Sequence, residues 1–331
     1  MIVRFGLIGA GRIGRIHGGN VAAGKDCTLA YIADAMPEAA AALAKDTGAK
    51  VAEIAAIVGA KDVDAVLICA PADTHAAPIE QCAKAGKAVF CEKPVDLSSQ
   101  RIRACLKAVD AAKIPLMIGF NRRFDPNFAA LKARLDAGAA GAIEIILIIS
   151  RDPAPLPASY IARSGGLFRD MMVHDLDMAR FLLNGEEPVS VMAMGSALVD
   201  AAIGAEGDVD TATVMLQTAS GRIVQISNSR RATYGYDQRI EVHGALGMIR
   251  AHNIPETTVE IATGAGFQAD PVQNFFLERY ASAYRLELAA FVTAVSSGIA
   301  ASPNGHDGLR AQMLADAATL AWQSRARVDV A

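Results

Sequence analysis

The sequence predicts an α/β protein with two domains, the first built on a doubly wound parallel sheet. Three observations predict this fold. Short apolar runs alternate with helical stretches over the first 120 residues, the first run ends in a glycine-rich turn, and 331 residues are too many for one ordinary core. We therefore place one domain at residues 1–122 and a second at residues 123–331, with C-terminal helices that return toward the first domain.

The first domain is expected to contain five strands separated by helices. Their apolar residues are continuous rather than alternating, as burial by helices on both faces requires. The strands are VRFGLIG (3–9), TLAYIAD (28–34), DAVLICA (64–70), AVFCE (88–92) and PLMIGF (115–120).

The second domain is expected to contain an open antiparallel sheet, because several strand-like segments follow one another with short turns between them. The segments are residues 143–150, 189–199, 210–218, 222–229, 238–244, 247–252 and 257–263. Two helical segments, at about 276–298 and 306–325, end the chain.

The composition excludes several classes of protein. Hydrophobic residues make up 52% of the chain and charged residues 20%, but no run of about 18 uncharged apolar residues could span a membrane. The net charge of −3 provides no basic surface for a nucleic acid. The five cysteines fit no disulfide or zinc pattern, which favours the reducing cytoplasm. The chain begins with a strand pattern rather than an export signal.

The turn after the first strand has the spacing of a dinucleotide site. It reads GAGRIG, with Gly9, Gly11 and Gly14 between a strand and a helix. In such a turn the first glycine permits the bend, the second lets the backbone approach a pyrophosphate, and the third lets helix and strand pack closely. The turn therefore predicts a Rossmann domain.

Asp34 ends the second strand, where a carboxylate can bind the hydroxyls of the adenosine ribose. Its charge would repel a 2′-phosphate, so NAD is favoured over NADP. Two alternatives stay open: Asp34 could be an ordinary capping carboxylate, and Arg12 or Arg15 could bind a phosphate.

Lys93, Asp170 and His174 are the residues with candidate chemistry. Lys93 follows a strand in CEKPVDLS, and ligands bind at the carboxyl ends of parallel strands. Asp170 and His174 lie four residues apart in GGLFRDMMVHDLDMARFLLNG, which predicts one shared helix face. The alternatives are a solvated lysine and a surface ion pair. A metal site that adds Asp177 is disfavoured, because no second histidine or cysteine lies near.

The order of these segments resembles the family of glucose-fructose oxidoreductase and inositol dehydrogenase-like proteins. The resemblance covers nearly the whole chain and rests on the glycine turn, ICAPADTHAAP, EKP, GFNRRFDP and the pattern GG-x(3)-D-x(3)-H. GFNRRFDP (119–126) and YGYD (234–237) look most like inositol 2-dehydrogenases. The resemblance implies a C-terminal α/β domain on a large open, mostly antiparallel sheet, and a homotetramer joined through those sheets.

The resemblance also implies that Lys93, Asp170 and His174 are the catalytic group. His174 would accept the hydroxyl proton and Lys93 would stabilise a developing alkoxide, so no metal is required. Cofactor contacts are expected from Gly9, Gly11, Arg12, Ile13, Gly14, Asp34, Ala70, Pro71, Thr74, His75, Glu92, Lys93 and Asn121. Substrate contacts are expected from Lys93, Arg122, Ser150, Asp152, Asp170, His174, Tyr234 and Tyr236. For His75, an ordinary place at a helix N-terminus is an equal alternative.

We expect NAD-dependent oxidation of a secondary ring alcohol, with myo- or scyllo-inositol as the leading substrate. Ser150, Arg151 and Asp152 stand where many inositol dehydrogenases have a histidine and a nearby asparagine, so the ring stereochemistry stays open. Two alternatives remain. One is an aldose 1-dehydrogenase that oxidises a pyranose to its 1,5-lactone, and the other is a non-catalytic NAD-binding sensor.

Overall fold

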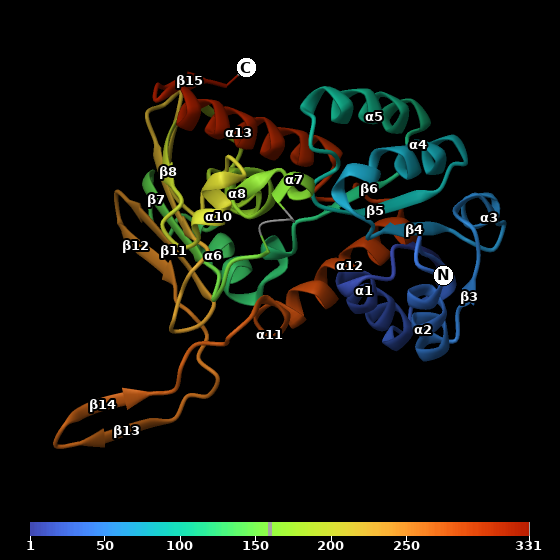
Figure 1. Ribbon diagram of the computed structural model, residues 1–331, viewed down its shortest axis with the longest axis horizontal. Coiled ribbons are helices and arrows are strands. Elements are labelled where there is room, and N and C mark those ends of the chain that lie inside the picture. The colour runs from blue at the N-terminus through green and yellow to red at the C-terminus, as the bar shows by residue number, and fades with distance from the viewer. Residues whose placement is uncertain (158–160, 331) are drawn as a thin grey trace. The chain divides into compact units, whose positions relative to one another are not determined.

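The computed structural model describes residues 1–157 and 161–330 (Figure 1). The chain forms two compact units, and each draws on two separate segments. The first unit consists of Met1–Phe124 and Ala283–Gln312, and the second of Asp125–Ser282 and Met313–Ala331. The described residues contain no candidate for a membrane-spanning helix.

The first unit contains a six-stranded sheet in the order β3-β2-β1-β4-β5-β6, with every neighbouring pair parallel. This confirms the predicted doubly wound sheet. The short strand β3 was not predicted, because two residues are too few to form a pattern. The strands are β1 (Val3–Ile8), β2 (Cys27–Ala33), β3 (Lys50–Val51), β4 (Ala65–Ile68), β5 (Ala88–Glu92) and β6 (Leu116–Gly119).

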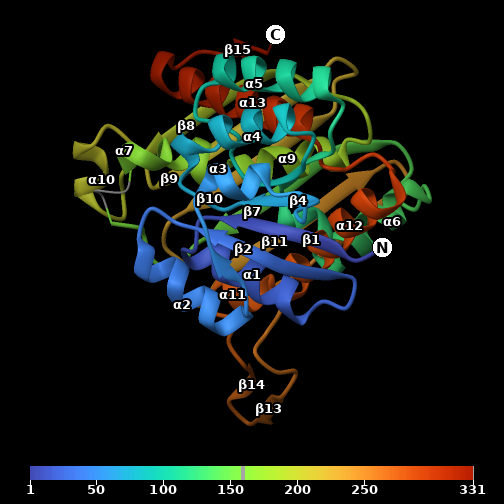
Figure 2. The same cartoon turned by 90° about the vertical axis from the view of Figure 1, so that its right-hand side faces the viewer.

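Helices cover this sheet on both faces, with α1 and α2 on one face and α4 and α5 on the other (Figure 2). Local signals begin and end several of them. Pro37 begins α2, Gly48 ends it at a left-handed φ of 76°, and the Ser98 side chain accepts the Arg101 N–H at the start of α5. The helices are α1 (Arg12–Ala23), α2 (Pro37–Thr47), α3 (Ile54–Gly59), η1 (Ala72–Thr74), α4 (Ala76–Lys84), α5 (Ser99–Ala112) and η2 (Asn121–Phe124).

Helix α12 (Ala281–Ser297) completes the core of the first unit. The Phe291 ring centroid lies 6.1 Å from that of Phe5 in β1 and 5.7 Å from that of Phe90 in β5. All three side chains are fully buried. A segment near the C-terminus therefore packs against the parallel sheet. Helix α13 (Gly305–Ser324) begins in the first unit and ends in the second.

The second unit contains a seven-stranded mixed sheet in the order β12-β11-β7-β10-β9-β8-β15. β7 and β10 pair in parallel, and the other neighbours pair antiparallel. The predicted mostly antiparallel sheet is confirmed. The strands are β7 (Ile143–Arg151), β8 (Pro188–Ser196), β9 (Thr211–Thr218), β10 (Ile223–Ser229), β11 (Asp237–Gly244), β12 (Gly247–Ala251) and β15 (Val328–Asp329).

The two faces of this sheet differ in what covers them. Helices including α6, α8 and α9 lie on one face (Figure 1), and the residues that point toward them are buried. The alternate residues form the opposite face, which we call the outer face. Its exposed large apolar residues are Ile145, Met192, Met194, Met215 and Met248. The helices of this unit are α6 (Pro126–Asp136), α7 (Ile161–Ser164), α8 (Gly166–Asp170), α9 (Val173–Leu182), α10 (Ala201–Ala205) and α11 (Phe276–Arg279).

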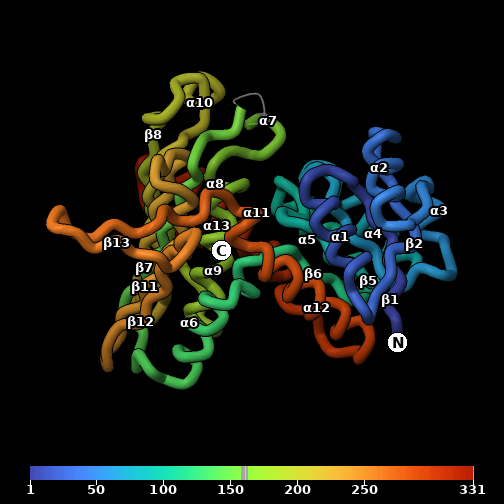
Figure 3. The backbone as a smooth tube through the Cα atoms, turned by 90° about the horizontal axis from the view of Figure 1, so that it is seen from below, coloured from blue at the N-terminus to red at the C-terminus, as the bar shows by residue number. Residues whose placement is uncertain are grey.

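Two element predictions for the second unit were wrong. The segment 257–263 does not join the main sheet: β13 (Glu260–Thr263) pairs with β14 (Gly266–Ala269) in a separate hairpin that projects from the unit (Figures 1 and 3). An alternating pattern identifies a strand but not its neighbour. The helix predicted at 276–298 is interrupted at Tyr280, between α11 and α12.

Arg279 and Asp125 form a buried ion pair in the second unit. Their side chains are each 1% exposed, and the guanidinium donates two hydrogen bonds to the carboxylate, one of them from Nη2 to Oδ1 at 3.2 Å. Asp125 also caps α6 by accepting the N–H groups of Asn127 and Phe128, both at 3.1 Å. Removal of the guanidinium would leave a buried carboxylate without its counter-charge.

We expect Arg279→Met to lower the free energy of unfolding by about 3–5 kcal/mol, the usual cost of breaking a buried pair. Arg327→Met is the control, because its pair with Asp329 has side chains 56% and 83% exposed. That change should alter stability by less than about 0.5 kcal/mol. Urea unfolding of the two variants measures both values, and equal effects would contradict the role given to burial.

Candidate active site

The glycine turn brings helix α1 against the end of β1. Gly9 has a left-handed φ of 98°, and a Cβ on Gly14 would lie 1.8 Å from the Gly9 carbonyl oxygen. A Cβ on Gly11 would meet no atom within 4 Å. The N-cap residue of α1, Gly11, has no side chain that could cap the first turn, and the N-terminus of a helix attracts anions. These features fit a pyrophosphate, with open space at Gly11 and tight packing at Gly9 and Gly14.

Asp34 follows β2, and its carboxylate is hydrogen-bonded to the backbone of the glycine turn. Its Oδ2 accepts the Ala10 N–H at 2.5 Å, and its Oδ1 accepts the Met36 N–H at 2.7 Å. The side chain is half-buried. A carboxylate at this position fits the ribose of a dinucleotide. Arg12 is exposed and Ile13 is half-buried in the first turn of α1.

His75 links the loops that follow β4 and β5. Its ring is 1% exposed, with Nδ1 2.7 Å from the Pro94 carbonyl oxygen and Nε2 2.6 Å from that of Ala70. Lys93 is half-buried in the second of these loops. The Thr74 hydroxyl donates to the Pro71 carbonyl at 2.7 Å. His75 therefore has a connecting role between two loops that contain cofactor candidates.

Asn121 and Arg122 lie in η2, directly after β6, and their side chains are almost fully buried. They follow the carboxyl end of a strand in the same sheet as Glu92, the last residue of β5. The candidates Gly9, Ala70, Glu92 and Asn121 thus occupy the ends of β1, β4, β5 and β6, where ligands of parallel sheets bind.

Asp170 and His174 do not share one continuous helix, so that prediction was wrong. Helix α8 ends at Asp170 and α9 begins at Val173. The His174 N–H points to the Met171 carbonyl at 3.4 Å instead of continuing the i to i−4 ladder. Both side chains are half-buried. They lie at the end of one helix and the start of the next.

The double glycine at the start of α8 explains how this helix begins. Gly165 and Gly166 have left-handed φ values of 81° and 82°, and a Cβ on Gly166 would lie 2.6 Å from Oδ1 of Asp208. That carboxylate accepts the Leu167 N–H at 3.0 and 3.1 Å. Burial raises the pKa of Asp208, although Leu167 N–H and the charge of Arg230 oppose the rise.

Arg230 supplies a buried positive charge beside two substrate candidates. Its guanidinium is 3% exposed and lies 3.5 Å from Oδ2 of Asp170 and 3.9 Å from Oδ2 of Asp152. A guanidinium between two carboxylates limits the positions that either can adopt. The sequence does not identify Arg230 as a site residue, because it lies in no motif and its carboxylate partners are 60 and 78 positions away.

Ser150 belongs to a buried polar network with Asp175, the residue that follows His174 in α9. Its side chain is fully buried, and the hydroxyl donates to Oδ1 of Asp175 at 2.5 Å. Asp175 Oδ2 also accepts a hydrogen bond from Asn228 Nδ2 at 2.9 Å. This network ties α9 to β7 and β10. The Ser150 hydroxyl is hydrogen-bonded to Asp175 and Gln238, and its substrate contact stays a prediction.

Tyr234 and Tyr236 differ in their surroundings. The Tyr234 hydroxyl donates to Asp237 at 2.6 Å and accepts from Arg151 at 3.1 Å. Arg151 and Asp237 are register partners on the outer face. Tyr236 is 7% exposed and packs edge-on against Tyr280 with centroids 5.9 Å apart. Tyr234 is therefore bonded to outer-face residues, whereas Tyr236 is part of the core.

The sequence reasoning also missed His17 and Glu287 of the first unit, which meet Glu92 in a buried cluster. His17 lies in none of the motifs that the sequence offers. One signal was available: His17 falls on the inward face of α1 with Gly14, Gly18 and Val21. Its partners are 75 and 270 positions away, and no spacing rule connects them.

Comparison with known proteins identifies relatives along most of the chain. Residues 3–120 match the profile of an oxidoreductase family with an NAD-binding Rossmann fold, and residues 128–250 match the GFO/IDH/MocA C-terminal domain. An inositol 2-dehydrogenase of Rhizobium meliloti is 54% identical over 331 residues, which is 100% of each chain.

Two solved structures share this fold over nearly their full length. A myo-inositol dehydrogenase from Corynebacterium glutamicum has a TM-score of 0.95 and 43% identity, over 100% of this chain and 99% of that one. A scyllo-inositol dehydrogenase from Lactobacillus casei, solved with bound NAD(H) and scyllo-inositol, has a TM-score of 0.92 and 30% identity, over the same shares.

The glycine turn permits a prediction that separates packing from cofactor binding. Gly14→Ala should lower the free energy of unfolding by about 1–3 kcal/mol, because α1 must move away from Gly9. Gly11→Ala should leave the stability of the free protein unchanged but raise the Kd for NADH at least about tenfold, a loss of about 1.4 kcal/mol. Thermal unfolding and fluorescence titration measure the two effects. Tight NADH binding by Gly11→Ala would exclude a pyrophosphate at this turn.

Proposed function

This chain belongs to the GFO/IDH/MocA oxidoreductase family, and from that premise we propose that it oxidises one ring hydroxyl of an inositol, with NAD as its cofactor. One observation supports this most strongly: the chain aligns from end to end with an inositol 2-dehydrogenase at 54% identity. The aligned length includes the glycine turn, Lys93, Asp170 and His174. Asp34 at the end of β2 supports NAD rather than NADP.

We assign the catalytic roles to Lys93, Asp170 and His174. Bound NAD supplies the hydride acceptor. His174 is the base that takes the proton of the reacting hydroxyl, since imidazole is the side chain best suited to proton transfer near neutral pH. The Lys93 ammonium stabilises the negative charge that develops on the oxygen. Asp170, held by the Arg230 guanidinium at 3.5 Å, accepts a hydrogen bond from a neighbouring substrate hydroxyl or from His174.

Arg230 and the network around Ser150 hold the neighbourhood of Asp170 and His174 in place. Arg230 limits the positions of the Asp170 and Asp152 carboxylates, and Asp175 anchors the first turn of α9 through Ser150 and Asn228. His174 lies next to Asp175 in that turn. A base held by a bonded neighbour keeps its ring in place during proton transfer.

The substrate is tested with a panel of inositol isomers and D- and L-aldoses, each with NAD and with NADP, scored by kcat/KM. We expect the highest values for myo- or scyllo-inositol with NAD. Faster oxidation of a pyranose to its lactone would replace the inositol with an aldose. Tight NADH binding without turnover of any compound would indicate a sensor instead of an enzyme.

Lys93→Met and His174→Ala should each lower kcat by about 10²- to 10⁴-fold, because each removes a group that acts in the transition state. NADH binding should persist in both. Lys45→Met in α2 and His306→Ala in α13 are matched controls, since Lys45 is exposed and the His306 side chain is 60% exposed. Steady-state kinetics and NADH titration give the two readouts. Turnover at the control level in both test variants would refute the assignment.

We propose further that the protein is a homotetramer joined through the outer faces of its mixed sheets, and that it works in the cytoplasm. The exposed methionines of the outer face support the first statement, because apolar patches of this kind are usually covered by a partner. All five cysteines are free thiols, which fits a reducing compartment.

The assembly is tested by light scattering after gel filtration. The wild-type protein should have the mass of four chains. Met194→Glu combined with Met215→Glu should shift the mass to a smaller species, since a buried unpaired carboxylate opposes association. Leu320→Glu in α13, where the leucine is 52% exposed, is the control and should keep the tetramer. A tetramer that survives the double substitution would place the interface elsewhere.

A further inference from the structure

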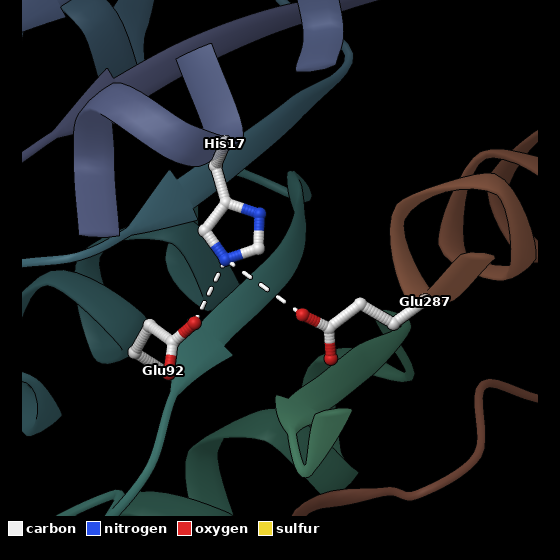
Figure 4. Close-up of side chains that lie close together, drawn as sticks. All are labelled: His17, Glu92 and Glu287. Carbon is white, nitrogen blue, oxygen red and sulfur yellow. Dashed lines mark hydrogen bonds and ion pairs between the residues drawn. The ribbon is translucent and has the colours of Figure 1, made fainter. Parts of the chain in front are cut away.

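Three titratable side chains meet inside the first unit. His17 comes from α1, Glu92 from the end of β5 and Glu287 from α12 (Figure 4). His17 Nε2 lies 2.7 Å from Oε1 of Glu92 and 3.9 Å from Oε1 of Glu287. The side chains of His17 and Glu287 are fully buried, and that of Glu92 is 12% exposed. Glu92 is thus the member of the cluster that reaches the solvent.

Glu287 is a buried carboxyl group without a close polar partner. Neither of its oxygens has a hydrogen-bond partner among the described residues, and the same holds for Nδ1 of His17. The surroundings are aromatic: the His17 ring lies edge-on to Phe90 and Tyr284, with centroids 4.9 and 5.7 Å away. An ionised carboxylate is costly in such a place. Burial, and then the charge of Glu92, raise the pKa of Glu287 well above its usual range.

When Glu287 is neutral, it does not compete as an anion for the His17 N–H, and His17 can donate its hydrogen bond to Glu92. With the proton on Nε2, the imidazole donates to the Glu92 carboxylate at 2.7 Å, a charge-assisted hydrogen bond. An ionised Glu287 would compete for the same N–H and would repel Glu92. The bond between His17 and Glu92 therefore depends on the proton held by Glu287.

Glu92 lies at the carboxyl edge of the parallel sheet, next to a proposed catalytic residue. It is the last residue of β5 and directly precedes Lys93. Its register partner Gly119 has no side chain, and a Cβ there would lie 3.0 Å from the Glu92 carboxyl group. The carboxylate is thus confined between the His17 ring and the Gly119 backbone. A shift of Glu92 would also move the backbone that leads into Lys93.

We propose that His17 and Glu287 are positioning residues that hold the Glu92 carboxylate at the cofactor edge of the first unit, with Glu287 in its neutral form. The inference rests on the proposed function, because it treats Glu92 and Lys93 as parts of the dehydrogenase site. Neither His17 nor Glu287 is assigned a contact with NAD or inositol. They act through Glu92.

The proposal implies a defined dependence on pH. The titratable groups that face Glu287 are His17 from α1, Glu92 of β5 and the Cys69 thiol after β4. Tyr284 of α12 packs against the other side of this cluster, edge-on to the His17 ring. The folded protein holds the Glu287 proton more tightly than the unfolded chain does. The contribution of Glu287 to the free energy of unfolding therefore falls as the pH rises above 4.5, the usual pKa of the group, until Glu287 ionises in the folded protein.

Glu287→Gln and His17→Phe test the two parts of the proposal. Glutamine resembles the neutral acid, so Glu287→Gln should bind NADH as the wild type does at neutral pH and should keep that affinity at alkaline pH, where the wild type weakens. Phenylalanine keeps an aromatic ring but has no donor, so His17→Phe should raise the Kd for NADH about tenfold, equal to about 1.4 kcal/mol. NADH fluorescence is measured without substrate.

The controls separate this proposal from others. His17→Gln carries an amide N–H and should recover part of the lost affinity, which a packing role alone would not produce. His306→Phe changes a histidine that is 60% exposed and should have no effect. Unchanged NADH affinity in His17→Phe would overturn the proposal while leaving inositol oxidation intact. A metal site would give a different result: one bound metal ion per chain, and NADH affinity that falls equally when the metal is chelated and in Glu287→Gln. That result would overturn the proposal.

Discussion

The close contact between helix α1 and the end of β1 is the constraint on which the proposed chemistry depends. The missing side chain of Gly14 lets the helix approach the Gly9 carbonyl, and Gly9 and Ala10 donate their N–H groups to Ala33 and Asp34. The helix N-terminus and an acidic group are thereby fixed at one edge of the sheet. The loops that contain Ala70 and Lys93 join this edge through the His75 ring.

The second unit positions its polar residues by a different principle. Buried charges and hydroxyls there are paired with one another, as low-dielectric surroundings demand. Asp175 is bonded to Ser150 and Asn228, and Arg230 stands beside Asp170 and Asp152. The break between α8 and α9 places Asp170 and His174 on different helices. Asp170 still lies beside Arg230, and His174 still precedes Asp175. Rigid support of this kind is what an oriented acid and base require.

Much of the fold could be predicted because its signals are local. The strand-turn-helix context of Gly9 to Gly14 and the continuous apolar strands were enough to identify the parallel sheet. The break at Met171 and Met172 was not, since methionine is a good helix former and nothing in the pattern marks the junction. The burial of Ser150 and the partners of Arg230 depend on residues distant in sequence. The cluster of His17, Glu92 and Glu287 joins three elements, and only the assembled unit brings them together.

Deuterium transfer is the measurement that tests the central claim most directly. The inositol isomer that is oxidised fastest, carrying deuterium on its reacting carbon, is incubated with the enzyme and NAD, and the isolated NADH is examined by NMR. The account predicts deuterium on a single face of nicotinamide C4, in equal amount to the ketone formed, because the ring carbon gives its hydride directly to the cofactor. Unlabelled NADH, or labelled inositol recovered without any NADH, would contradict it.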